Sequence, residues 1–307
     1  MPSVAAARNA NAKFHPSYSP VAVFVGGTSG IGQAMAEAFA RYTNGKASIF
    51  ILGRNRTAGE AIIATFPKPQ DAESQWHHEF LECDVWLMKN VHALTKTLLE
   101  RVSTINFLVF TQSVPTLGPK QESAEGLDIR LALRYYSRWV LIDDLLPGLR
   151  KARELGQDAK VMSILAAGQY SKLDINDLGL KKKFTPYKAM LQTASYNDLM
   201  VAEYAKRELD IAFTHIYPGY VKTPWIYKID DWVFRAMYPI MFPLYLVFTT
   251  PVKDCAEYML FALFDGEKGM FRRGPTGDNI AYSRLGENDL KDASAIFLLL
   301  SYVTKLL

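Results

Sequence analysis

The sequence predicts an α/β fold, with a single domain built on a doubly wound parallel sheet, an apolar lid and a C-terminal extension. Two observations support this prediction. Short apolar runs alternate with longer helix-forming segments, which is typical of a parallel sheet with helices on both faces. The first run, within residues 21–40, passes through glycines directly into a helix. With 307 residues, the chain is long enough for such a domain to bury a full core.

The composition is that of an ordinary globular protein, with 49% apolar and 21% charged residues. The net charge of +4 is small and scattered. Its one tight run, Lys181-Lys182-Lys183, fits a solvated loop, so we expect no nucleic-acid partner. Two cysteines, Cys83 and Cys255, argue against a disulfide framework or a metal site. Residues 1–20 lack the apolar core of a secretory signal, so we expect an N-terminal arm and a cytoplasmic location.

A glycine loop follows the first apolar run, with the spacing Gly26-x-x-x-Gly30-x-Gly32. Gly26 permits a sharp turn, Gly30 lets the backbone approach a pyrophosphate, and Gly32 lets the helix pack on its strand. The helix N-terminus offers free N–H groups to the anion. A purely structural turn is the alternative, but the flanking strand and helix favour dinucleotide binding. The expected cofactor contacts here are Gly26, Thr28, Ser29, Gly30, Ile31 and Gly32.

The second apolar run, residues 47–52, ends in Gly53-Arg54-Asn55-Arg56. An acidic residue at this point binds the adenosine ribose and repels a 2′-phosphate, but none is present. Arg54 stands in its place, and a guanidinium can hold a phosphate through two parallel hydrogen bonds. A surface arginine is the alternative interpretation. We predict NADP as the cofactor, bound by Arg54 and Asn55, with Arg56 as a candidate to assist.

The remaining elements follow in alternation. A helix over 57–65 ends at Pro67 and Pro69, and a third strand within residues 77–83 then leads to Asp84-Val85. The long helix after the fourth strand is expected to close at Pro147-Gly148. The other expected segments are helices over 91–101, 127–146 and 186–208, strands over 106–110, 161–165 and 211–217, and an insertion around 173–178.

The glycine spacing, with Ile31 between the last two glycines, and the later turn Pro218-Gly219-Tyr220-Val221-Lys222-Thr223 resemble the short-chain dehydrogenase/reductase family over about residues 20–265. The insertion is similar to that of the retinol-dehydrogenase-like branch. The usual threonine before the first glycine is Val25 here. This resemblance implies a Rossmann-type domain over 21–265, between an arm at 1–20 and an extension at 266–307. It also implies that Asp84 and Val85 line the adenine pocket and that Pro218, Gly219, Val221 and Thr223 receive the nicotinamide.

The family's catalytic set is largely missing. It comprises a tyrosine acid/base, a lysine one helical turn later, a serine and an asparagine. Tyr187 is the best tyrosine, but Leu191 stands where the lysine belongs. The serine position holds Leu165, with Ser163 nearby, and the asparagine position falls near Arg134. Tyr187 and Ser163 are therefore the catalytic candidates.

Two further polar segments are considered for the same site. Phe110-Thr111-Gln112-Ser113 replaces the family's Asn-Asn-Ala-Gly, although Gln112 or Ser113 could still touch the cofactor by backbone. Tyr196, Asn197 and Asp198 could form a replacement polar set on the helix that Tyr187 begins. We expect them instead to be exposed and structural.

Residues 236–252 are almost wholly apolar but are broken by Pro239, Pro243 and Pro251, so a membrane-spanning helix is not expected. In the family this region forms the substrate lid, here 224–252. An apolar lid indicates a bulky hydrophobic substrate or a surface that dips into a membrane. The apolar tail, 293–307, could cover the lid, form a homodimer contact or touch lipid. We favour packing against protein.

The sequence therefore predicts an NADP-dependent oxidoreductase that reduces a carbonyl of a hydrophobic molecule, such as a lipid or an intermediate of secondary metabolism. The alternative is an NADP-binding protein of the same fold that has lost catalysis and serves as a regulator or scaffold. The cofactor half of the pattern is intact under both hypotheses. Only the catalytic half distinguishes them.

Overall fold

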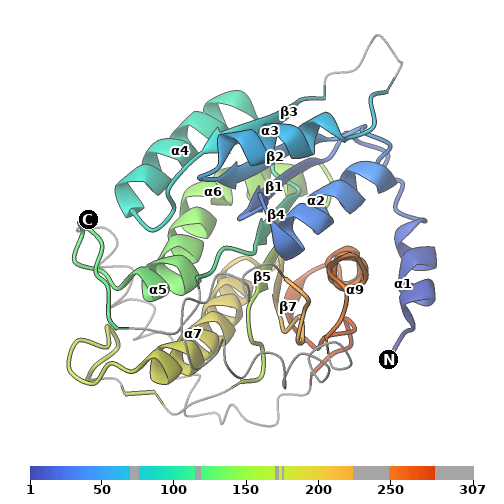
Figure 1. Cartoon of the computed structure of the whole chain (residues 1–307). Helices are drawn as coiled ribbons and strands as arrows, with labels where there is room; N and C mark the ends of the chain where they lie inside the picture. Colours follow the sequence, from blue (N-terminus) through green and yellow to red (C-terminus); the bar gives the residue numbers. More distant parts are fainter. Residues whose placement is uncertain (70–75, 115–118, 170–172, 175, 224–248, 281–307) are drawn as a thin grey trace.

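The computed structural model describes residues 1–69, 76–114, 119–169, 173–174, 176–223 and 249–280. They form one parallel sheet with helices on both faces (Figure 1). The strands are β1 (Val21–Val25), β2 (Ser48–Gly53), β3 (His78–Glu82), β4 (Phe107–Phe110), β5 (Lys160–Ile164), β6 (Ala212–Ile216) and β7 (Gly269–Arg273).

The sheet has the order β3-β2-β1-β4-β5-β6-β7, and every pairing is parallel. In register, Val23 lies between Phe50 of β2 and Leu108 of β4. The chain winds outward from β1 in one direction and from β4 in the other, so the order reverses between these two strands. This confirms the predicted doubly wound sheet and places its ligand crevice beyond the carboxyl ends of β1 and β4.

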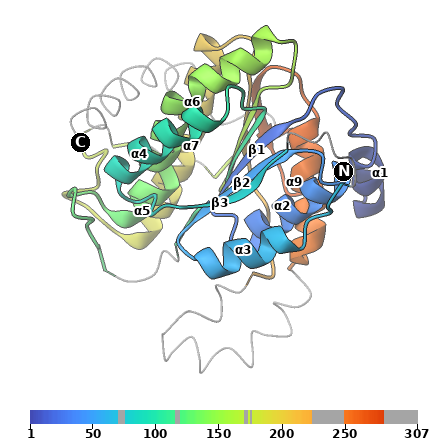
Figure 2. The same cartoon turned by 90° about the horizontal axis from the view of Figure 1, so that it is seen from above.

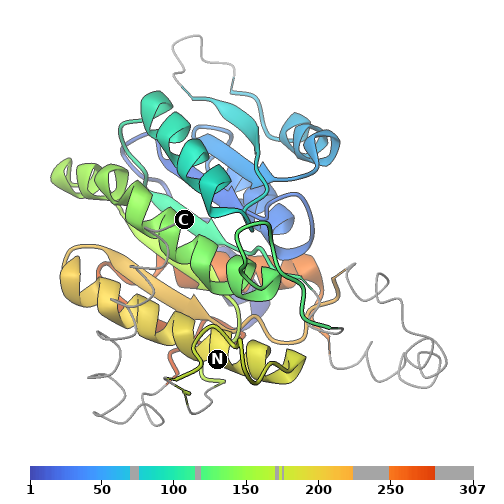
Figure 3. The same cartoon turned by 90° about the vertical axis from the view of Figure 1, so that its left-hand side faces the viewer.

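The helices form two layers, seen from above in Figure 2. One layer holds α2 (Gly30–Tyr42), α3 (Arg56–Ala64) and α9 (Val252–Phe264), and the other holds α4 (Met88–Arg101), α6 (Ser137–Glu154) and α7 (Pro186–Arg207). Figure 3 faces the second layer. The short helix α5 (Ile129–Leu131) runs into α6 through a π-helical turn, η1 (Ala132–Tyr136).

The core lies on both sides of the sheet. Because successive side chains of a strand point to opposite faces, Val23 and Val25 pack toward α4, α6 and α7, whereas Ala22 and Phe24 pack toward α2 and α9. All five residues of β1 are buried. Burial on both faces explains why this strand has an unbroken apolar sequence.

The structure corrects two expectations about helices. The helix expected to close at Pro147 continues through it to Glu154. Tyr196, Asn197 and Asp198 were expected to be exposed, but each is at most 1% exposed. The reason is that α7 packs between α6 and the β6–β7 edge, so most of its circumference is covered, polar positions included.

The two ends of the described chain extend the domain. The arm before β1 contains helix α1 (Val4–Asn11), whose Arg8 pairs with Asp254 of α9 at 2.6 Å. The segment after residue 265 contributes β7, the last strand of the sheet. Most of the expected lid and the apolar tail, residues 224–248 and 281–307, lie outside the described residues. Within the part that is described, no helix is both long and apolar enough to cross a membrane.

Candidate functional site

The glycine loop lies at the carboxyl end of β1, against the loop that follows β4. Gly26 has a φ of +82°, and a Cβ there would lie 2.7 Å from the backbone nitrogen of Gln112. A Cβ on Gly32 would lie within 2.7 Å of the Gly26 oxygen and closer still to Oγ1 of Thr111. Both positions therefore require glycine, because neighbouring atoms leave no room for a Cβ. Gly32 lets its helix pack closely on the loop after β4 as well as on the turn at Gly26.

Gly30 differs because a Cβ there would make no tight contact. Its φ is +59°, and a Cβ would meet only the side chain of Thr223, at 3.5 Å. Ser29 occupies the N-cap position of α2 without a side-chain capping bond. The N-terminus of α2, with its free N–H groups, therefore lies beside the predicted nicotinamide turn.

The turn after β6 is held in place by backbone hydrogen bonds. Gly219 has a φ of +75°, which favours glycine. The Thr250 nitrogen donates to the Tyr220 oxygen at 2.8 Å, and the Lys222 nitrogen donates to the Thr250 oxygen at 3.0 Å. These bonds fix Val221 and Thr223 beside the glycine loop. Pro218 begins the turn, and one residue separates it from the end of β6.

At the other end of the crevice, Arg54 follows β2 and lies over the ring of Trp86, with its guanidinium carbon 4.9 Å from the ring centre. Asp84 lies nearby. Burial raises the pKa of its carboxyl, and the positive charge of Arg54 opposes that shift. Its Oδ1 atom is buried and has no hydrogen-bond partner in the described structure. Val85, beside it, is buried.

The two neighbours of Arg54 in the predicted set have other partners. Asn55 is the N-cap of α3, where its side chain accepts from the Ala58 nitrogen at 2.9 Å. Arg56 pairs with Glu82 at 3.2 Å and with Glu60 at 3.3 Å. Arg54 is therefore the better candidate for a phosphate contact.

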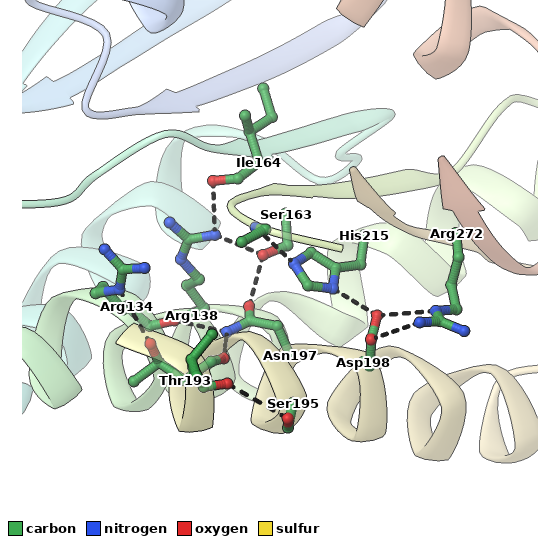
Figure 4. A network of polar contacts seen from close by, with 12 residues as sticks. Arg134, Arg138, Ser163, Ile164, Thr193, Ser195, Asn197, Asp198, His215 and Arg272 are labelled. Carbon is green, nitrogen blue, oxygen red and sulfur yellow. Dashed lines mark hydrogen bonds and ion pairs between the residues drawn. The ribbon is translucent and has the colours of Figure 1, made fainter. Parts of the chain in front are cut away.

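The structure does not bring the two predicted catalytic residues together. Ser163 is fully buried at the end of β5, where it accepts from Arg138 Nη1 at 2.5 Å and donates to Asn197 Oδ1 at 2.6 Å (Figure 4). Tyr187 lies in the first turn of α7 and is 67% exposed. Because it precedes Asn197 by ten residues, it is roughly 15 Å away along the helix axis.

Arg138 ties together the ends of two central strands. Its Nη1 also donates to the Ile164 oxygen at 3.2 Å, and its Nη2 donates to the Gln112 oxygen at 2.9 Å. The side chain is fully buried. Burial, with a smaller contribution from the charge of Arg134, lowers the pKa of Arg138 to about 9.

Arg134 lies one helical turn earlier, in η1. Its Nε donates to Thr193 Oγ1 at 3.0 Å, and its Nη1 donates to Ser113 Oγ at 3.3 Å. Burial lowers its pKa to about 10. Sequence reasoning placed Arg134 at the family's asparagine position but gave it no role. A charged residue in a run of apolar helix residues was the signal that could have found it.

A second buried network was also missed. Asp198 Oδ1 accepts from His215 Nδ1 at 2.7 Å, and Arg272 binds both carboxylate oxygens at 3.0 and 3.1 Å. The Ala166 nitrogen donates to His215 Nε2 at 3.3 Å, which assigns the ring proton to Nδ1. Burial raises the pKa of Asp198, but His215 and Arg272 together outweigh burial and leave it lowered.

A cavity of about 330 Å³ lies elsewhere, among α1, α2 and α9. Its cations are largely matched by acids, because Arg8 and Arg41 both pair with Glu257. It is lined from the far side of α2, away from the glycine loop. We therefore place the candidate site at the crevice and not at this cavity. In the described residues, no cluster of three His, Cys, Asp or Glu side chains could hold a metal ion.

Comparison with known proteins agrees with this geometry. The family model described as short chain dehydrogenase matches residues 20–129. Oxidoreductase andH of Emericella variicolor is 31% identical over 262 residues, which are 85% of this chain and 74% of that protein. Human polyprenol dehydrogenase is 24% identical over 244 residues, 78% of this chain and 71% of that protein.

Solved structures share the fold. The crystal structure of a protein from Mycobacterium paratuberculosis aligns with a TM-score of 0.70 over 96% of this chain and 97% of its own, at 19% identity. That likeness concerns the fold alone. The sequence relatives, the seven-stranded sheet and the glycine loop identify the chain as an oxidoreductase of the short-chain dehydrogenase family.

Proposed function

We propose that this protein is an NADP-dependent reductase that acts on a carbonyl of a hydrophobic substrate. The proposal rests on one structural feature at each end of the crevice. At one end the N-terminus of α2 lies beside the turn after β6, where a Cβ on Gly30 would meet only the Thr223 side chain at ordinary contact distance. At the other end Arg54 takes the place of an acid after β2. The first suits a nicotinamide dinucleotide, and the second suits its 2′-phosphate.

The residues present fit such a cofactor. The N-terminus of α2, with Thr28, Ser29 and the glycines, would hold the pyrophosphate. Asp84 would use its unpartnered buried Oδ1 toward the adenine end. The turn from Pro218 to Thr223 would hold the nicotinamide end. A bound reduced nicotinamide supplies a hydride to a carbonyl carbon.

The choice of Arg54 for the phosphate rests on its charge balance. Arg56 pairs with two carboxylates, those of Glu60 and Glu82. Arg54 instead lies over the ring of Trp86, and its nearby acid is Asp84, whose carboxyl has a pKa raised by burial. A guanidinium stacked on an indole keeps its edge free for two parallel hydrogen bonds. This is the geometry that a phosphate recognises.

The substrate class rests on the apolar sequence of residues 236–252. The name of the human relative refers to a polyprenol, which is a hydrophobic alcohol. We extend only that general chemistry to this chain. Peripheral membrane contact and a homodimer stay predictions, because both depend on segments outside the described residues. A regulatory protein that binds the cofactor without turnover is the competing outcome of the test below.

The test measures binding before turnover. Isothermal calorimetry on the purified protein should show tighter binding of NADPH than of NADH. A panel of apolar ketones and aldehydes is then added with NADPH, and absorbance at the reduced nicotinamide band should fall only when a carbonyl is present. Equal affinity for the two cofactors would contradict the NADP assignment. NADPH binding with no carbonyl-dependent oxidation across the panel would favour the regulatory protein.

A further inference from the structure

We propose that Arg134 holds the reacting oxygen of the substrate through its guanidinium group, in the place of the tyrosine and lysine that the family would use. The proposal rests on the proposed function, since it names the group that would receive the carbonyl oxygen in that site. It assigns a catalytic role to a residue that the sequence pattern left without one.

The position of Arg134 relative to the crevice is the first argument. Its Nη1 reaches Ser113, the third residue after β4, at 3.3 Å. Thr111, two residues before Ser113, is in contact distance of the glycine loop at Gly26 and Gly32. Arg134 therefore lies at the carboxyl end of β4, on one side of the point where the sheet order reverses. Ligands of open α/β sheets bind at this point.

The donors that Arg134 leaves unused are the second argument. Its Nε and Nη1 bond to Thr193 and Ser113, but across the described ranges no protein acceptor is bonded to its Nη2. Only 7% of the residue is exposed. Both of its bonded partners are neutral hydroxyls. A guanidinium in such a place retains a full charge and at least one free N–H edge for an oxygen ligand.

The charge balance around Arg134 is the third argument. Burial alone lowers the pKa of Arg134. The pKa of Arg138 is lowered by burial and by the positive charge of Arg134. The buried carboxylate of Asp198 is already shared by His215 and Arg272. In the described part of the chain, the two guanidinium groups thus lie together without a paired carboxylate, an arrangement that a negatively charged oxygen would stabilise.

Arg138 cannot take this role itself, although it is the closer of the two to Ser163. It is fully buried, and its Nη groups are occupied by Ser163 and the oxygens of Gln112 and Ile164. Figure 4 shows the two arginines side by side, with Arg138 directed at the strand ends. Arg138 is a positioning residue, because it fixes the loop after β4 that carries Ser113.

The chemistry that this arrangement supports is a carbonyl reduction. As the carbonyl carbon gains the hydride, the π electrons of the C=O bond move onto the oxygen, which becomes an alkoxide. The Arg134 guanidinium holds that negative charge through its free N–H edge at a position where only 7% of the residue is exposed. A proton from solvent water then completes the alcohol, leaving the nicotinamide oxidised and hydroxide in solution.

The experiment uses benzoate, a small molecule with an oxyanion on an apolar ring, as the probe. NADPH is first bound to the full chain and its affinity is measured by calorimetry. Benzoate is then titrated into the complex. Wild type should bind it, and Arg134→Gln should bind it at least about tenfold more weakly, because a charge-assisted hydrogen bond is lost. Arg150→Gln is the matched control, since Arg150 pairs with Glu208 on the surface.

The outcomes separate the two proposals. Failure of wild type to bind NADPH would overturn the proposed function. Binding of NADPH without binding of benzoate, or equal benzoate affinity in wild type and Arg134→Gln, would overturn the role of Arg134 alone. If Arg134→Gln does not fold, as judged by thermal unfolding, Arg134→Lys replaces it. Lysine keeps the charge but lacks the planar fork, so affinity should fall by at least about threefold, and an unchanged affinity would overturn the proposal.

Activity provides a second readout once a carbonyl substrate is found. Arg134→Ala should lose turnover while its KM for NADPH is unchanged. Millimolar guanidinium chloride should restore part of the lost kcat in that variant and should have no such effect on wild type. Rescue of this kind requires the guanidinium to act on the reaction, which a purely structural arginine would not show. Absence of rescue in a folded variant would contradict the proposal.

Discussion

Two buried arginines that lie one helical turn apart have different roles, because their N–H donors are satisfied to different extents. Arg138 uses its Nη groups on protein oxygens and holds the ends of β4 and β5 together. Among the described residues, Arg134 bonds to two hydroxyls and its Nη2 has no acceptor. Both have lowered pKa values because burial disfavours their charge. The difference between structural and chemical function therefore lies in which donors are already satisfied.

Arg54→Glu tests the cofactor assignment at the same scale. It should weaken NADPH binding by roughly 1.5–3 kcal/mol, the value of a hydrogen bond to a charged group, and leave NADH binding nearly unchanged. Arg56→Glu is the matched control. Arg56 already pairs with Glu60 and Glu82, so its loss should affect NADPH less. Calorimetric titration of both cofactors into each variant gives the comparison, and a larger effect at Arg56 would contradict it.

Tyr187→Phe tests the acid/base expected from the sequence. Tyr187 is 67% exposed and about three helical turns from the residue of α7 that touches Ser163. We therefore expect turnover within about threefold of wild type, against the roughly 10²–10⁴-fold loss that removal of a general acid causes. The readout is the steady-state rate of NADPH oxidation with a carbonyl substrate. A loss in the larger range would restore Tyr187 and count against Arg134.

At the scale of elements, the glycine loop combines two different requirements. Gly26 and Gly32 are fixed by packing, since any side chain there would collide with the loop after β4. Gly30 has a positive φ, and a Cβ there would meet only the Thr223 side chain, at ordinary contact distance. The loop can thus be divided into glycines that hold the fold and one glycine that leaves room for a ligand.

Gly30→Val tests that division. The variant should remain folded, lose some stability because of its φ of +59°, and show no measurable NADPH binding. Gly126→Val is the matched control, because Gly126 has a φ of +71° and nothing within 4 Å of its Cβ position. Thermal unfolding should show similar losses of stability in the two variants. Normal NADPH binding by Gly30→Val would mean that the loop is merely a turn.

Across the whole molecule, the network of Asp198, His215 and Arg272 joins α7 to β6 and β7. In the strand order, β6 and β7 lie at one edge of the sheet, three and four positions away from β1, which carries the glycine loop. The network is buried, and the printed ion pairs of Asp198 are with His215 and Arg272. Loss of one member should therefore destabilise the entire fold and not a single loop.

Asp198→Asn tests this at neutral and acid pH. At pH 7 we expect a loss of about 3–5 kcal/mol, because Arg272 is left buried without its carboxylate. The pKa of Asp198 is lowered in the folded protein, so its stabilisation is complete above the unfolded value of about 3.9 and is lost as pH falls through the folded value. The variant should therefore lose less stability than wild type on acidification below pH 4.

Urea unfolding between pH 7 and pH 3 provides the measurement for Asp198→Asn. Asp210→Asn is the matched control, since Asp210 pairs with Lys268 on the surface and is 67% exposed in its side chain. The control should change stability by less than about 1 kcal/mol at each pH. Parallel pH profiles of wild type and Asp198→Asn would contradict the assigned role.

Local patterns were sufficient for the strands and for the cofactor half of the site. Apolar runs predicted the first, second, fourth, fifth and sixth strands, and the glycine spacing predicted a turn whose positive φ values at Gly26 and Gly30 the structure contains. The third strand was placed by its position before Asp84-Val85, since its sequence is largely polar. The strand β7 was missed because two of its five residues are arginines, so no apolar run marks it. Pro147 was taken as a helix end, because a sequence alone does not show that packing on both sides holds α6 together.

The sequence by itself determined the fold class, the position of the glycine loop and the charge of the residue after β2, because each depends on neighbours in the chain. Only the tertiary structure decided which polar residues are buried and which donors remain free. Ser163, Asn197 and Arg138 come from different elements, and no periodicity in any one of them reveals their contact. Arg134 becomes a candidate only when Thr193 and Ser113 are seen to leave part of its guanidinium unpaired. Hydrogen bonding between distant segments, and the burial that gives it weight, is a property of the folded chain.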